Sequence, residues 1–125
     1  MTRARVKSGT TDMNWIKLEN MEGLKEAHQL SFEKPVVIFK HSTRCATSSL
    51  VLNKLERKWS EDETNGTPAY FLDLIRYRDV SNAIESQYGI YHESPQILIL
   101  ENGKATYDAS HFYISYDDVL KKIPA

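Results

Sequence analysis

The residues from Pro35 to Trp59, PVVIFKHSTRCATSSLVLNKLERKW, contain the change of pattern that decides the fold. The run 36–39 is rich in β-branched and aromatic side chains and predicts a buried strand. Five polar residues follow, and Ser42 or Thr43 among them can act as the N-cap of a helix. Beyond them a set of residues recurs at the spacing of an amphipathic helix: Ser48, Leu52, Leu55 and Trp59.

The only cysteine of the chain, Cys45, lies where the predicted strand turns into the predicted helix. Backbone N–H groups in the first turn of a helix lack internal partners, and the helix dipole adds positive charge there. A thiolate is favoured over a thiol in such a place, and Arg44, Lys40 and His41 add nearby basic groups. The alternative is a small buried cysteine, but Cys45 lies between an arginine and small residues, off the apolar stripe. The pattern therefore favours a reactive thiol.

Length and composition indicate one globular domain with an ordinary core, since the chain has 125 residues, 41% of them hydrophobic. The net charge of -1 gives no reason to expect a nucleic-acid partner or an anionic membrane surface. No apolar run is long enough to span a membrane, and the first residues lack the apolar core of a secretory signal. We expect a flexible N-terminal tail over 1–13 and the domain over 14–125. One cysteine excludes an internal disulfide, which favours a cytoplasmic location.

The remaining elements alternate between strand and helix patterns, with a hairpin near the end. They are a strand at 15–18, a helix from Asn20, a strand at 69–75, a helix at 76–88 with Gly89 as its C-cap, a strand at 96–101, an Asn102-Gly103 turn, a strand at 104–108 and a helix from Ser115 or Tyr116. The order β-α-β-α-β-α-β-β-α predicts an α/β fold: one mixed sheet, partly parallel, with helices on both faces.

This element order, with a cysteine at the start of the helix after the second strand, resembles the thioredoxin fold. Ser94-Pro95, just before the strand at 96–101, supports the resemblance. Thioredoxin-like proteins carry a cis X-Pro bond at that place, facing the active-site cysteine. The sequence permits a cis bond there but does not show one.

Two segments resemble the YtxJ-type monothiol bacilliredoxins more narrowly: PVVIFKHSTRCATS at 35–48 and YHESPQILIL at 91–100. Members of that family commonly carry Cys-Pro-Ile-Ser, whereas this chain has Ala46 after the cysteine and Ser48 at the place of a second cysteine. The resemblance implies reduction of mixed disulfides between proteins and bacillithiol, with Cys45 as the nucleophile. The implied partners are S-thiolated client proteins and a small thiol as co-substrate, with no permanently bound cofactor. We expect a monomer or a weak dimer.

Six neighbours of the thiol are candidate stabilising or substrate-binding residues. Arg44 and Lys40 can favour the thiolate and hold carboxylates of the small thiol, or can be solvated surface charges. His41 can exchange a proton with the thiol or merely cap the strand. Ser48 cannot resolve a disulfide, but its hydroxyl can hydrogen-bond the thiolate from one helical turn away. The resemblance places Ser94 and Pro95 opposite Cys45, where their backbone can pair with an extended substrate.

Other kinds of function are weaker alternatives. Cys45 with His41, His92 and His111 matches no zinc spacing, so we expect no metal site. An iron–sulfur role needs a second chain and an added thiol. Peroxidase chemistry is disfavoured because the Pro-x-x-x-Thr-x-x-Cys pattern is missing. The main rival is a thioredoxin-like module that binds a partner or small thiol without turnover.

Overall fold

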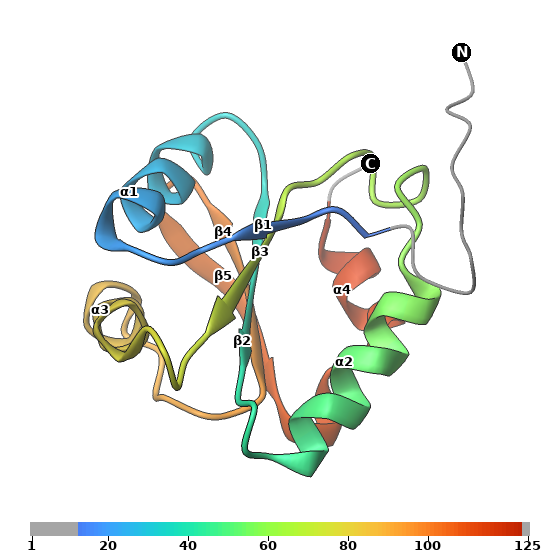
Figure 1. The fold of residues 1–125 in the computed structure, drawn as a ribbon. Helices are drawn as coiled ribbons and strands as arrows, with labels where there is room; N and C mark the ends of the chain where they lie inside the picture. Colours follow the sequence, from blue (N-terminus) through green and yellow to red (C-terminus); the bar gives the residue numbers. More distant parts are fainter. Residues whose placement is uncertain (1–12, 124–125) are drawn as a thin grey trace.

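Residues 13–123 are described in a computed structural model, and residues 1–12 and 124–125 lie outside the description. Within residues 13–123, five strands and four α-helices follow the predicted order, and one short 3-10 helix, η1, precedes the last helix (Figure 1). The elements are β1 Trp15–Lys17, α1 Met21–Leu30, β2 Val36–His41, α2 Ala46–Lys58, β3 Ala69–Asp73, α3 Arg78–Tyr88, β4 Gln96–Glu101, β5 Lys104–Ser110, η1 His111–Tyr113 and α4 Tyr116–Lys122.

β2 is the central strand of a sheet whose order is β1-β3-β2-β4-β5. It runs parallel to β3 on one side and antiparallel to β4 on the other, and all six of its residues are buried. β1 also runs parallel to β3, while β4 and β5 form the antiparallel hairpin. The sheet is therefore mixed, which confirms the prediction.

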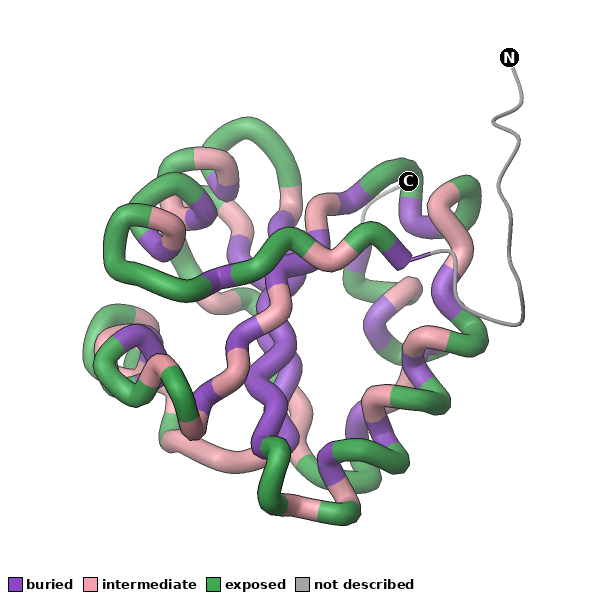
Figure 2. Tube along the Cα trace, viewed as in Figure 1, coloured by how far each residue is buried: buried purple, intermediate pink, exposed green. Residues whose placement is uncertain are grey.

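Alternate residues of β2 enter two separate cores, because successive side chains of a strand point to opposite faces. Val37 and Phe39 pack with residues of α2 and α4, whereas Val36 and Ile38 pack with residues of α1 and α3. Figure 1 shows these two pairs of helices on opposite sides of the sheet, and Figure 2 shows the buried residues gathered between them. The prediction of an α/β fold with helices on both faces is confirmed.

Local sequence signals set several of the element ends. The Asn20 side chain caps α1 by accepting a hydrogen bond from the Gly23 N–H at 2.7 Å. Gly89 ends α3 in the left-handed conformation, with φ 67°, as its position in the sequence predicts. Asn102 and Gly103 both have positive φ, which is the geometry of a tight two-residue hairpin turn.

The structure differs from the predictions at several places. β3 ends at Asp73 and not at residue 75, and α3 begins at Arg78 and not at residue 76. β2 extends two residues further than expected, so Lys40 and His41 belong to the strand and not to the following turn. β5 extends to Ser110, and the sequence did not predict η1 after it. Met13, which we assigned to a flexible tail, is buried in the core beside α2, whereas the rest of that tail lies outside the described residues.

Residues 13–123 form four α-helices and one short 3-10 helix. None of them combines the length and the apolar character that crossing a bilayer requires.

Candidate active site

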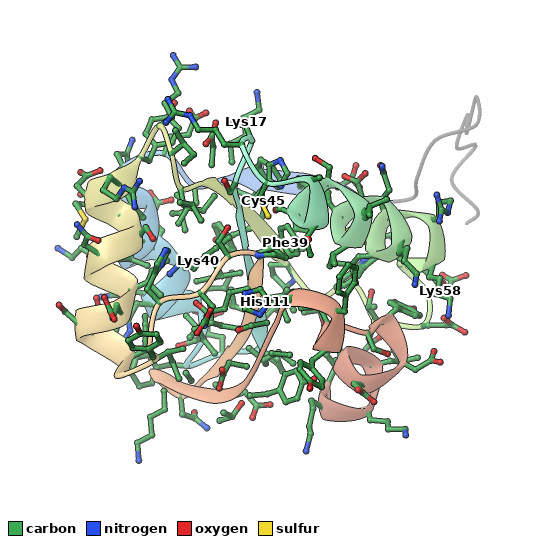
Figure 3. The ribbon with its side chains drawn as sticks, turned by 90° about the horizontal axis from the view of Figure 1, so that it is seen from below. Lys17, Phe39, Lys40, Cys45, Lys58 and His111 are labelled. Atoms are coloured by element: carbon green, nitrogen blue, oxygen red, sulfur yellow. The ribbon has the colours of Figure 1, made fainter. Side chains whose placement is uncertain are left out.

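Cys45 lies at the junction between β2 and α2, where it is the N-cap residue of the helix. Its backbone is extended, with φ -119° and ψ 117°, and its carbonyl accepts a hydrogen bond from the Ser49 N–H at 3.3 Å. The residue is partly exposed, and Figure 3 shows its sulfur at the start of α2. The thiol therefore lies beside the unpaired N–H groups of the first helical turn, as the sequence predicted.

The expectation that Ser42 or Thr43 caps α2 is wrong. The longer β2 shifts the start of the helix, and the intervening turn is closed by a bond from the Cys45 N–H to the Ser42 carbonyl at 3.2 Å. The Ser42 hydroxyl accepts a hydrogen bond from the Arg44 N–H at 3.3 Å and so stabilises this turn. Cys45 itself becomes the cap residue, with no side-chain capping bond.

The Ser48 hydroxyl lies one turn into α2 and joins the helix to the end of β2. Its Oγ accepts a hydrogen bond from the Ser42 N–H at 3.1 Å and lies 2.7 Å from His41 Nδ1. Ser48 is fully buried. Within residues 13–123 no hydrogen bond reaches the Cys45 sulfur, so the expected bond from Ser48 is not formed here.

His41 is buried against aromatic rings on the α2 side of the sheet. Its ring stacks on Phe39 and packs against Phe71. Burial lowers the pKa of His41, although the carboxylates of Asp73 and Glu56 act in the opposite direction. Because the ring is neutral and the Ser42 N–H already donates to the hydroxyl oxygen, we assign the Ser48 hydroxyl as the donor to Nδ1.

Lys40 points to the other side of the sheet from His41 and the thiol. Its side chain, labelled in Figure 3, is fully buried. Its Nζ donates to His92 Nδ1 at 2.9 Å. Burial lowers the pKa of Lys40 to about 8, opposed by the charge of Glu85 on α3. The expectation that Lys40 lies beside the thiolate or at the surface is therefore not met, because the strand alternation directs it away.

Arg44 is exposed and directly precedes the cysteine. Its backbone N–H is engaged by Ser42, and within residues 13–123 its guanidinium forms no hydrogen bond or ion pair. An exposed guanidinium on the residue before Cys45 is available for an anionic group of a substrate.

The Ser94-Pro95 bond is cis, and the pairing of β2 with β4 places it next to the turn that carries the thiol. Lys40 pairs with Gln96, so one further step of the register sets Pro95 across from His41. The Pro95 carbonyl accepts a hydrogen bond from the His111 N–H of η1 at 2.9 Å. His111 Nε2 in turn lies 3.3 Å from a carboxylate oxygen of Glu93.

The sequence had given little weight to the residues that surround this proline on the α3 side. His92, Gln96 and Glu85 contact the segment before Pro95 or lie within it. One sequence feature could have pointed to them: Lys40 and Gln96 are polar residues near the ends of two otherwise apolar strands.

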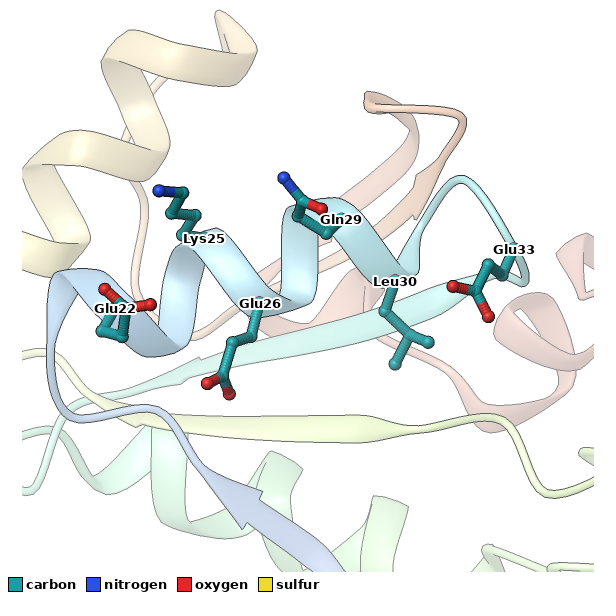
Figure 4. A pocket seen from close by; sticks show the side chains of 6 residues that line it. All are labelled: Glu22, Lys25, Glu26, Gln29, Leu30 and Glu33. Carbon is teal, nitrogen blue, oxygen red and sulfur yellow. The ribbon is translucent and has the colours of Figure 1, made fainter.

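Two other places do not form part of this site. Among residues 13–123, no group of three or more His, Cys, Asp or Glu side chains is arranged to hold a metal ion. The open hollow drawn in Figure 4 lies along α1 and contains none of the residues around the thiol. Its lining residues are Glu22, Lys25, Glu26, Gln29, Leu30 and Glu33.

The sheet order and the position of the thiol define a thioredoxin-fold protein. The structure matches a proposed oxidoreductase with a thioredoxin fold at 26% identity, covering 85% of this chain and 90% of that one, with a TM-score of 0.71. It also matches a thioredoxin of Malassezia sympodialis at 14% identity, covering 92% of this chain and 95% of that one, with a TM-score of 0.73. Mitochondrial thioredoxin 3 of Saccharomyces cerevisiae matches at 16% identity, covering 87% and 92%, with a TM-score of 0.63.

A family model described as monothiol bacilliredoxin BrxC matches residues 16–119. The chain therefore belongs to the monothiol bacilliredoxin BrxC family. Family and fold together assign it to the thiol–disulfide oxidoreductases.

Proposed function

We propose that this protein removes bacillithiol, or a similar small thiol, from S-thiolated proteins by disulfide exchange at Cys45. The observation that carries the proposal is the contrast between Cys45 and Ser48. The thiol is partly exposed at the start of α2, whereas the next inward position of the helix is a buried hydroxyl engaged by Ser42 and His41. Exchange can begin at the surface, and the sequence has no second cysteine whose thiol could complete it internally.

In the first step, the Cys45 thiolate attacks the small-thiol sulfur of the mixed disulfide. The old S–S bond breaks, and the client sulfur leaves as a thiolate that takes a proton from water. Cys45 is left in a disulfide with the small thiol, so the client is reduced and Cys45 is oxidised by the same two electrons.

In the second step, another molecule of small thiol attacks the small-thiol sulfur bound to Cys45. The Cys45 thiolate leaves, and the two small thiols depart joined by a disulfide. An external thiol is required because a serine hydroxyl does not displace sulfur. The small thiol is thus a co-substrate and not a bound cofactor.

The neighbours have separate roles in this proposal. The guanidinium of Arg44, which is unpaired among residues 13–123, attracts carboxylates of the small thiol. The backbone at Ser94 and Pro95 pairs with an extended segment of the client, as an added strand would. His41 and Ser48 fix the start of α2 relative to β2 and therefore the position of Cys45. We place the activity in the cytoplasm and expect a monomer or weak dimer.

Turnover of a bacillithiolated model protein tests the proposal. Intact mass spectrometry follows loss of the adduct from the client in the presence of excess bacillithiol, with wild type compared to Cys45→Ser. A client carrying a glutathione adduct is the matched control for the identity of the small thiol.

We expect wild type to return the client reduced and Cys45→Ser to be inactive. Faster release of bacillithiol than of glutathione supports the specific substrate. If the client stays modified while the Cys45 thiol is free and accessible, the enzymatic proposal fails and a binding module without turnover replaces it.

A further inference from the structure

Residues 91–95 belong to the connection between α3 and β4 and make polar contacts with several elements, among them β2, β4 and α3. Lys40 of β2 donates to His92 Nδ1 at 2.9 Å, and Gln96 of β4 donates from Nε2 to the Tyr91 carbonyl at 2.9 Å. Glu85 of α3 accepts from the His92 N–H at 3.1 Å. This segment ends at the cis Ser94-Pro95 bond.

Lys40 and Gln96 are a cross-strand pair of buried polar residues in an otherwise apolar part of the sheet. They are directly opposite in the β2–β4 register, so their side chains share the face covered by α3. Both are almost completely buried, at 0% and 1% exposed, which is costly for an amine and an amide. Within residues 13–123 the Lys40 amine hydrogen-bonds only His92. Lys40 and Gln96 therefore donate hydrogen bonds to residues of the 91–95 segment and not to each other.

The charge states fix the direction of the bond between Lys40 and His92. Burial lowers the pKa of Lys40 only to about 8, so the amine is charged near neutral pH. Burial, and then the charges of Lys40 and Arg78, lower the pKa of His92, while the Glu85 and Glu93 carboxylates oppose them. The neutral ring accepts at Nδ1, and the Ser81 hydroxyl lies 3.4 Å from the same atom.

The held segment lies beside the thiol turn on the other face of the sheet. One step past the Lys40–Gln96 pair, the register brings Pro95 to the position across from His41. The Ser42 carbonyl accepts from the Cys45 N–H, so the turn that carries the thiol begins where β2 ends.

We propose that Lys40 is a positioning residue that holds the 91–95 segment from the face of the sheet opposite Cys45. It thereby sets the affinity for the protein substrate and not the reactivity of the thiol. The effect on substrate affinity rests on the proposed function. The contact by which Lys40 holds the 91–95 segment, called the tether below, does not.

Three variants of the full chain test the tether. Lys40→Met keeps an unbranched side chain of similar size and removes the donor. His92→Leu removes the acceptor, and His92→Asn, its matched control, retains an acceptor oxygen near the place of Nδ1. Amide hydrogen exchange of residues 91–94 is measured against residues 97–100 of β4, with urea unfolding as the check on folding.

We expect exchange at 91–94 to accelerate about tenfold in Lys40→Met and His92→Leu, the effect of losing one hydrogen bond, with β4 unchanged. His92→Asn should exchange as wild type does. Unchanged exchange at 91–94 in folded Lys40→Met or His92→Leu overturns the proposal. Should Lys40→Met not fold, the two His92 variants decide it.

The kinetic readout separates positioning from a general structural role. KM for a bacillithiolated protein should rise about tenfold in Lys40→Met and His92→Leu, with kcat and the rate of Cys45 alkylation by iodoacetamide unchanged. His92→Asn should restore KM. A loss confined to the alkylation rate contradicts the proposal. If wild type shows no turnover, the proposed function fails, and the exchange rates alone decide the tether.

Discussion

Lys40 and His41 are adjacent in the chain, yet they belong to two separate networks on opposite faces of the sheet. His41 bonds the Ser48 hydroxyl on the α2 side and thereby joins β2 to the helix that carries the thiol. Lys40 bonds His92 on the α3 side and joins β2 to the segment that carries Pro95. Burial lowers the pKa of both residues, but near neutral pH His41 is uncharged and Lys40 is charged.

The end of β2 therefore contacts both sides of the candidate site. Because side chains alternate along a strand, two successive polar residues reach two different structures. The α2 network joins β2 to the start of the helix that carries Cys45, and the α3 network joins β2 to the segment that carries Pro95. The following experiments perturb one network at a time.

The largest expected effect is the loss of the aromatic support under His41. Phe39 is fully buried and contacts His41, Phe71 and Trp15. Phe39→Ala should lower the free energy of unfolding by about 3–5 kcal/mol, measured by urea denaturation, because it removes a buried ring and leaves a cavity. Phe112→Ala, at a residue that is 67% exposed, is the control and should change stability by less than about 0.5 kcal/mol. Equal effects of the two substitutions would contradict the assignment of the core.

The second-largest expected effect is the contribution of Lys40 to stability, which depends on pH. Its pKa falls from 10.5 to about 8 on folding, so between these values the unfolded chain binds more protons than the folded one. The free energy of unfolding of wild type should therefore rise relative to that of Lys40→Met as the pH increases from about 8 to 10.5. The full change is up to about 3 kcal/mol for this buried group.

The measurement is urea unfolding of wild type and Lys40→Met across the same pH range. Burial raises the pKa of Tyr88 and Tyr116 to about 12, which reduces stability above pH 10 in both proteins and cancels in the difference. Near neutral pH we expect the variant to be at least as stable as wild type, because the buried charge is costly. A difference that does not change with pH would refute the buried, charged state of Lys40.

Ser48→Ala breaks the α2 network without touching the α3 network. It leaves the Ser42 N–H without its acceptor and His41 Nδ1 without its neighbour, so we expect a loss of about 1–3 kcal/mol. Hydrogen exchange should accelerate at the Ser42 amide and remain unchanged at residues 91–94. Faster exchange in both segments would mean that the two networks are not independent.

Arg44→Ala should have the smallest effect on stability, within about 0.5 kcal/mol, because the side chain is exposed and unpaired among the described residues. The rate with bacillithiolated protein should fall several-fold and become less sensitive to salt, since a charge that attracts the small thiol is lost. Arg44→Lys is the control that keeps the charge. An unchanged rate and salt dependence in Arg44→Ala would exclude this role.

Much of the fold is predictable because its signals are local. The apolar run and the Asn102-Gly103 turn set the bounds of β4 correctly, and Gly89 marks the end of α3. The place of Cys45 between strand and helix also follows from the change of periodicity around it. These features depend on neighbours within a few residues.

The contacts of Lys40 and His92 are not predictable in the same way, because 52 residues separate them in the chain. Polar residues after an apolar run indicated a surface turn. They are buried because β3 and β4 flank β2 to its end, with His41 opposite Asp73 and Lys40 opposite Gln96. If the predicted strand had included residues 40 and 41, strand alternation would have placed Lys40 and His41 on opposite faces of the sheet.

A single turnover without added small thiol shows which sulfur of the mixed disulfide Cys45 attacks. Equimolar wild-type protein and bacillithiolated client are mixed, quenched with acid and weighed intact. We predict that the bacillithiol adduct moves to Cys45 and that the client appears reduced. An unmodified Cys45 beside a fully modified client, or a disulfide that joins Cys45 to the client itself, would contradict attack at the small-thiol sulfur.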